Sequence, residues 1–128
     1  MLITSIPQYI QGLTNAKLDL TTTNATVLYT APSASDFNSS VVNSILVSED
    51  SGNADTITVT VTTPGGVAFT LFHVKAVGAS TTIELLTRDL ILESGEILKV
   101  TAATANRLHV VASIQEFTKT RISTSAGL

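Results

Sequence analysis

The chain has 128 residues and a formal net charge of −3 at neutral pH, with 13% charged residues, 44% hydrophobic residues and no cysteine. This length fits one domain with a real core. The scattered basic residues argue against nucleic-acid binding through phosphate contacts, and the lack of cysteine excludes disulfides and thiolate metal sites. Charged residues reach about half of their usual share. We therefore expect a surface that is either neutral and hydroxyl-rich or partly covered by other chains, and such a surface favours assembly.

No apolar run approaches the length of a membrane span. The N-terminal sequence MLITSIPQYI has neither the basic region nor the long apolar stretch of a signal peptide. We expect no membrane partner and synthesis in the cytoplasm.

Residues 1–20 have no clean hydrophobic period. Pro7 and Gly12 interrupt a spacing that partly fits a helix, so the segment is predicted as a short amphipathic helix or an extended arm. Its apolar residues are Ile3, Ile6, Tyr9, Ile10 and Leu13. They exceed what a free tail carries, and they pack either on their own domain or on a neighbouring subunit.

Short β-rich runs follow this segment. Thr26–Thr30 ends before Pro32, because proline is poorly tolerated inside a ladder. Val41–Glu49 is the next predicted strand, after a polar loop. The turn cluster 50–53 joins it to Asp55–Thr62, and this predicts a hairpin of these two strands.

The stretch Asp55–Val74 is the best-specified part of the chain. Ile57, Val59 and Val61 alternate with threonines, which predicts a strand with one apolar face. The sequence Thr-Pro-Gly-Gly then turns the chain into a second strand over Val67–Val74. Both faces of this second strand are apolar: Phe69 and Leu71 on one, and Ala68, Phe72 and Val74 on the other. One face is expected to meet the core and the other a loop, an arm or another chain.

The remaining predicted strands are Thr81–Leu86, Asp89–Glu93, Ile97–Ala102 and Arg107–Phe117. About seven or eight short strands at regular spacing predict an all-β antiparallel sandwich, jelly-roll-like, with an N-terminal arm. The predicted division is an arm over residues 1–20, a sandwich over 21–117 and a polar, flexible tail over 118–128. Leu98 and Val100 are expected to point inward. In each of the other strands the apolar residues share one face: Ile83 with Leu85, Leu90 with Leu92, and Leu108 with Val110, Ala112 and Ile114.

No catalytic motif accompanies this pattern. His73 and His109 lack a partner at local spacing and are interpreted as packed or edge residues. The acidic loop 49–55 resembles a calcium loop, but Gly52 comes too early and the later glutamate is missing, so a polar turn is predicted. No enzyme activity, catalytic residue, cofactor or metal ligand is predicted.

A glycan site is the remaining chemical alternative. Carboxylates could serve acid–base work on a sugar, but the chain has no Trp and only two Tyr on which sugars could stack. We therefore rank a glycan-binding module below a structural role. The carboxylates available to such a site are Glu84, Asp89, Glu93 and Glu96.

The order of several segments resembles a known class of protein. These segments are ATVLYTAP (25–32), VVNSILVSEDSGNADTITVTV (41–61) and TIELLTRDLILESGEILKVTA (82–102), ending in RLHVVASIQE (107–116). Over about residues 20–117 the chain is similar to the small β-sandwich accessory proteins of tailed bacteriophages, especially phages of cyanobacteria.

The resemblance implies a virion structural protein. Such proteins commonly decorate or cement the capsid as homotrimers and bind the major capsid protein, and related sandwiches occur in the neck, tail or baseplate. The expected location is the virion, and the expected partners are other copies of the chain and capsid protein. The residues predicted to form the assembly interface are Ile3, Ile6, Tyr9, Ile10, Leu13 and Phe72.

Overall fold

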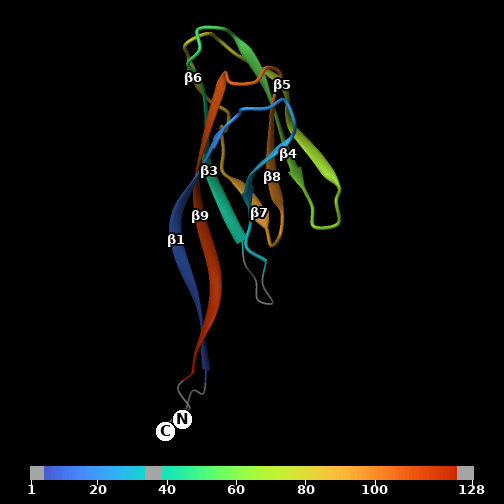
Figure 1. Ribbon diagram of the computed structural model, residues 1–128. Coiled ribbons are helices and arrows are strands. Elements are labelled where there is room, and N and C mark those ends of the chain that lie inside the picture. Colours follow the sequence, from blue (N-terminus) through green and yellow to red (C-terminus); the bar gives the residue numbers. More distant parts are fainter. Residues whose placement is uncertain (1–4, 34–38, 124–128) are drawn as a thin grey trace.

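Two antiparallel sheets pack face to face in the computed structural model, which describes residues 5–33 and 39–123 (Figure 1). The larger sheet has the order β1 (Ser5–Asp19), β9 (Leu108–Ser123), β3 (Ser39–Glu49) and β6 (Thr82–Glu84), and β7 (Leu90–Glu93) also pairs with β3. The smaller sheet has the order β2 (Thr26–Thr30), β8 (Ile97–Ala102), β4 (Asp55–Thr62) and β5 (Ala68–Val77). The predicted all-β antiparallel sandwich is confirmed. Within the described ranges, no helix is long and apolar enough to cross a membrane.

The core lies between the sheets and follows the period-two pattern of the strands. Ile57, Val59 and Val61 of β4 are buried, as the alternation with threonine predicts. The strands β8 and β9 turn their predicted apolar faces to the same interior, so both sheets fill one core. The fully buried members of this core include Leu98, Val100, Leu108, Val110, Ala112 and Ile114.

The pairing of β4 confirms one predicted hairpin and corrects another. β4 pairs with β5 through the turn at Thr63–Gly66, as expected. The hairpin predicted between 41–49 and 55–62 is wrong, because β3 pairs with β9, β6 and β7, whereas β4 pairs with β5 and β8. The turn between β3 and β4 carries the chain from one sheet to the other. Each strand can then bury its apolar face against the opposite sheet.

The N-terminal segment is extended. Of the two predicted conformations, helix or arm, the structure has a strand over Ser5–Asp19 that pairs with β9 along its whole length. The residues after Phe117, predicted as a flexible tail, continue β9 to Ser123, because they pair with Ser5–Ile10 of β1. The proposed partition into arm, sandwich and tail remains a prediction.

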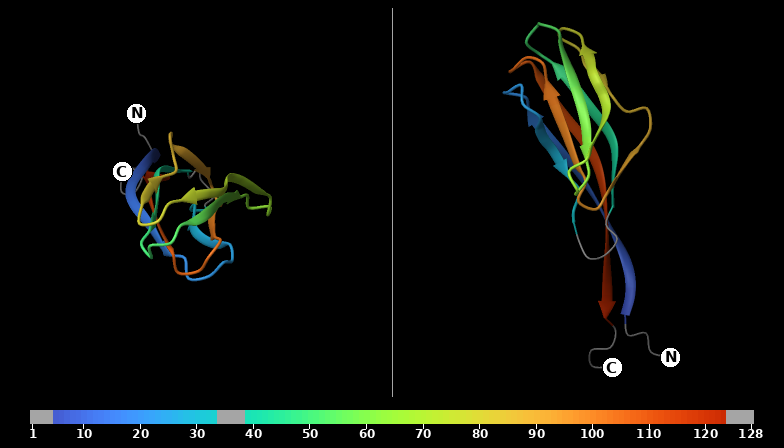
Figure 2. Two further views of the ribbon diagram at one scale, coloured as in Figure 1. Left: turned by 90° about the horizontal axis from the view of Figure 1, so that it is seen from above. Right: turned by 90° about the vertical axis from the view of Figure 1, so that its right-hand side faces the viewer.

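The far ends of β1 and β9 leave the sandwich together. β3 begins at Ser39, opposite Phe117, so the six pairs between Ser5–Ile10 and Thr118–Ser123 have no third strand in the described part of the chain. These twelve residues form a two-stranded ribbon that projects well beyond the two sheets (Figure 1, Figure 2). We call this segment the ribbon.

Candidate assembly surfaces

Exposed apolar side chains concentrate on the β4–β5 hairpin. Among the described residues, eight large apolar side chains are exposed, and four of them lie within Val67–Val74. β5 is the edge strand of its sheet and pairs only with β4, and the hairpin projects sideways from the sandwich (Figure 2). The four are Val67, Phe69, Leu71 and Val74, and we call them the β5 patch.

The prediction that one face of this strand meets the core is correct only in part. Phe72 is half-buried and packs against the core, and Val77 is fully buried. Phe69, however, is 56% exposed, although it pairs with the inward-facing Val61. Residues 67–71 are all exposed, so both faces of this part of β5 are left to other contacts.

The backbone of β5 is irregular in its middle. Between the pairs Ile57–Lys75 and Thr60–Thr70, β5 contains two more residues than β4, which marks β-bulges. Val74 has a φ of 50°, a conformation that β-branched residues rarely adopt. Its amide donates a hydrogen bond to the Thr58 Oγ1 atom at 3.0 Å. The bulges displace this part of β5 from regular pairing, and Leu71 and Phe72 line the depression beside it.

That depression is a shallow apolar groove of about 350 Å³. It lies between β5 of the smaller sheet and the segment that joins β6 to β7. Leu71 and Phe72 form one wall. The other lining residues are Leu85, Leu86, Thr87, Arg88, Asp89 and Leu90. The groove therefore presents mainly apolar side chains, four leucines and one phenylalanine, with one cation and one anion.

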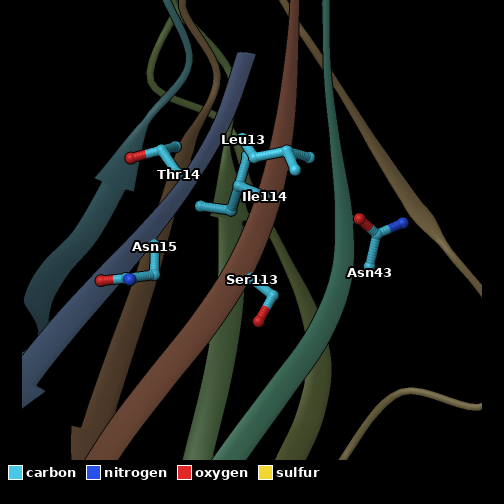
Figure 3. A pocket seen from close by; sticks show the side chains of 6 residues that line it. All are labelled: Leu13, Thr14, Asn15, Asn43, Ser113 and Ile114. Carbon is cyan, nitrogen blue, oxygen red and sulfur yellow. The ribbon is translucent and has the colours of Figure 1, made fainter. Parts of the chain in front are cut away.

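A second depression, of about 300 Å³, lies on the larger sheet where the ribbon begins (Figure 3). Leu13, 80% exposed, lies beside the polar Asn15, Asn43 and Ser113. Asn43 is the bulged residue of β3, and its Nδ2 atom donates to Asp89 Oδ1 at 3.1 Å. Since Asp89 also lines the apolar groove, this hydrogen bond connects the margins of the two depressions.

The predicted interface residues fall on separate parts of the molecule. Ile6, Tyr9 and Ile10 belong to the β1 half of the ribbon, and Ile3 lies outside the described residues. Leu13 lines the depression on the larger sheet, whereas Phe72 lines the groove beside β5. The β5 patch itself was not among the predicted interface residues, although its signal, a strand that is apolar on both faces, was present in the sequence.

The two histidines lie on different sheets, His73 on β5 and His109 on β9. His73 is exposed on β5. His109 Nε2 lies 3.1 Å from Asp50 Oδ2, and its Nδ1 lies 3.6 Å from Asp19 Oδ1. The carboxylates contact opposite nitrogens of the ring, so they do not converge on one point. In the part of the chain that the structure describes, no group of three His, Cys, Asp or Glu residues could hold a metal ion.

Glu49 organises the loop that resembles a calcium site. Its buried carboxylate accepts hydrogen bonds from the Ser51 hydroxyl and from the amides of Ser51 and Ser80, the latter at 2.7 Å. The amides of Gly52 and Asn53 complete this set. The Ser51 hydroxyl and the backbone donors outweigh burial and lower the pKa of Glu49 to about 2. The carboxylate is occupied by donors from its own chain, as the prediction of a polar turn requires.

Two further carboxylates join the strands. Burial opposes ionisation of Glu84, but hydrogen bonds from the Ser44 hydroxyl and the Ile45 amide hold its pKa below the usual value. Glu116 accepts a hydrogen bond from the Tyr29 hydroxyl. An acid catalyst on a glycan needs a raised pKa, so the lowered pKa of Glu84 fits a structural contact.

Comparison with known proteins adds a likeness of fold. No protein-family model matches the sequence, and no curated protein matches it. A chain from the acid-stable capsid of Helicobacter pylori bacteriophage KHP30 is similar in structure, with a TM-score of 0.51 and 15% identity over 92% of this chain and 99% of that one. At this identity the likeness shows a shared fold.

Two more distant likenesses also involve virus particles. One is to the virus-like particle of the extra small virus of the prawn Macrobrachium rosenbergii, with a TM-score of 0.39 and 12% identity over 85% of this chain and 79% of that one. The other is to the Gx strain of infectious bursal disease virus, with a TM-score of 0.42 and 8% identity over 96% of this chain and 33% of that one. TM-scores of this size do not establish a common topology. The fold that this chain has, an antiparallel sandwich of two sheets, is one that also occurs in a bacteriophage capsid.

Proposed function

We propose that this chain is a non-enzymatic structural protein of a bacteriophage particle. The observation that carries the proposal is the likeness to a chain of the KHP30 capsid, which spans 92% of this chain and 99% of that one. The match therefore covers nearly all of both chains, and not one local motif.

The surface of the molecule supports a role in assembly. The β5 patch, the apolar groove and the ribbon all offer contacts that the described residues do not use. Burial of apolar area contributes about 25 cal/mol per Å², and a particle multiplies weak contacts through effective concentration. A sandwich that keeps such surfaces open is suited to a place among many neighbours.

The finer form of the proposal is a capsid decoration or cement protein. In this form the chain associates as a homotrimer and binds the major capsid protein, with Ile6, Tyr9 and Ile10 of the ribbon among the contacts. Virion location follows from this role. The alternative within the same class is a component of the neck, tail or baseplate. The number of copies of the chain per particle distinguishes this alternative from a capsid role.

Quantitative mass spectrometry of purified particles of the phage that encodes the chain tests the proposal. Symmetric assembly predicts on the order of hundreds of copies for a capsid decoration protein and about a dozen or fewer for a neck or tail component. Absence of the chain from particles that are otherwise complete would overturn the virion role.

A further inference from the structure

The ribbon has unpaired backbone edges and no packing layer among the described residues. Its six residue pairs stand alone beyond the start of β3 at Ser39. Two strands without a third strand or a packing layer are marginally stable in water. Each strand of the ribbon also has one backbone edge with no partner strand in the described ranges. Pro7 lacks an amide hydrogen, so one backbone donor is missing from the β1 half. The remaining backbone groups of the two outer edges are open to a further strand.

β5 also has an unpaired backbone edge among the described residues. Its outer edge has no partner strand within residues 5–33 and 39–123, and natural proteins protect such edges with charges, prolines or bulges. The bulges of β5 lie between Thr70 and Lys75, whereas the pairing from Ala68 to Thr70 is regular. No Asp, Glu, Lys or Arg occurs between Asp55 and Lys75. The edge from Ala68 to Thr70 therefore has neither a charge nor a bulge to oppose an incoming strand, and burial of the β5 patch favours its addition.

Charge favours contact between the ribbon and the body of another copy. Lys119 and Arg121 are the charged residues of the ribbon, and all ten acidic residues lie within residues 12–117 together with the other five basic ones. The ribbon thus carries +2, and the rest of the chain carries −5, with histidine neutral. Opposite charge favours this pairing over ribbon with ribbon.

The dimensions permit this contact. Six residues of extended strand span about 20 Å, and the regular part of β5, Ala68–Thr70, spans about 10 Å, so about half of the ribbon can pair with it. The ribbon points away from the two sheets of its own molecule (Figure 1, Figure 2), so it reaches such an edge only on a neighbour.

We propose that the ribbon of one copy adds, edge to edge, to β5 of a second copy. The contact is head to tail, and such contacts close into rings when the rotation between copies permits. Main-chain hydrogen bonds supply the affinity, as in strand addition by peptides, and the β5 patch is covered in the same step. This proposal names how copies join, and it rests on the proposed function only for its setting, a particle with many copies.

A pair of matched leucines provides the first test. Leu71 and Leu46 are 40% and 39% exposed, but Leu71 lies on β5 and Leu46 on β3 of the other sheet. Leu71→Lys should weaken self-association by roughly tenfold or more in sedimentation equilibrium, and Leu46→Lys should leave it unchanged. Circular dichroism confirms that both variants fold. A wild-type chain that stays monomeric at its highest soluble concentration, or an equal effect of both variants, would overturn the proposal.

Cross-linking identifies the two surfaces directly, because the natural chain has no cysteine. Gln8→Cys on the ribbon and Thr70→Cys on β5 are made as separate proteins, mixed and oxidised. A disulfide between the two variants is expected, and Ser51→Cys in place of Thr70→Cys should give none. A disulfide formed by Thr70→Cys alone but not by the mixture would show β5 paired with β5 and overturn the proposal. Particles that contain the chain without this cross-link would leave the proposed function intact, so the two failures are distinguishable.

Discussion

At the scale of single residues, polar side chains hold the loops of this sandwich. The Glu49 carboxylate accepts hydrogen bonds from the turn that follows it and from the Ser80 amide. It thereby joins the β3–β4 crossing to the loop after β5. The residue types of this loop predict a turn, but the donor from Ser80 is 31 positions away in the chain. Only the fold brings this donor to Glu49.

Glu49→Gln tests this contact through its pH dependence. The pKa of Glu49 is lowered from 4.5 to about 2 in the folded state, so its ionisation stabilises the fold above about pH 4.5, and this contribution is lost as the pH falls through 2. Glu49→Gln should lower the urea midpoint at pH 7. The difference in urea midpoint between the variant and wild type should decrease steadily below pH 4.5. Glu93→Gln, at the exposed end of β7, serves as the control. A gap that stays constant down to pH 2 would contradict the assigned role.

Tyr29→Phe tests the polar contact between the sheets. The Tyr29 hydroxyl lies 2.8 Å from the oxygen of the buried Ser40 and donates to Glu116. Burial and the Glu116 contact raise the pKa of Tyr29 to about 12, so the phenol is neutral at pH 7. Removing it leaves Ser40 and Glu116 short of a partner, which should lower the free energy of unfolding by about 1–2 kcal/mol. Urea denaturation measures the change, and a value within about 0.5 kcal/mol of wild type, the usual range for exposed sites, would show that water replaces the hydroxyl.

At the scale of elements, strands were predictable where one face is buried. The alternation in β4 and the apolar face of β9 follow directly from period-two packing, and both are confirmed. Strand pairing was harder to predict. A turn cluster indicates that the chain reverses its direction, but it does not indicate which of the two sheets the next strand joins. The predicted hairpin of 41–49 with 55–62 failed for this reason. The candidate assembly surface is signalled in part: the sequence shows the two apolar faces of Val67–Val74 but not the bulges between them.

The bulged part of β5 carries a local strain that a substitution can relieve. Val74 has a positive φ and is 52% exposed, and this conformation costs an L-residue about 1–2 kcal/mol, whereas asparagine adopts it more readily. Val74→Asn should therefore raise the free energy of unfolding by about 0.5–1 kcal/mol. Val67 is similarly exposed, at 56%, and Val67→Asn should bring no such gain. Equal responses of the two positions in chemical denaturation would show that the strain at Val74 is compensated locally.

At the scale of the whole molecule, the sandwich and the ribbon differ in what they contribute to folding. The core is built between the two sheets, and β1 still contributes Gly12–Asp19 to the larger sheet after the ribbon is removed. The ribbon adds six residue pairs without a third strand, so its contribution to the stability of one isolated copy should be small. Folding and assembly should then be separable by shortening the chain.

A chain of residues 12–117 is the experiment that separates them. Its free energy of unfolding should lie within about 1 kcal/mol of the full chain, since the core is intact and the lost ribbon is marginal by itself. Its self-association and its binding to particles that lack the protein should both be lost, because it retains the β5 edge but not the ribbon that meets it. Mixing it with the full chain provides the control, since the ribbon of the full chain can still add to the β5 edge of the shortened one. A shortened chain that unfolds cooperatively but at a much lower urea midpoint would show that the ribbon is part of the folding unit. A shortened chain that folds and still assembles alone would show that assembly proceeds through another surface, such as the depression at Leu13 or the apolar groove.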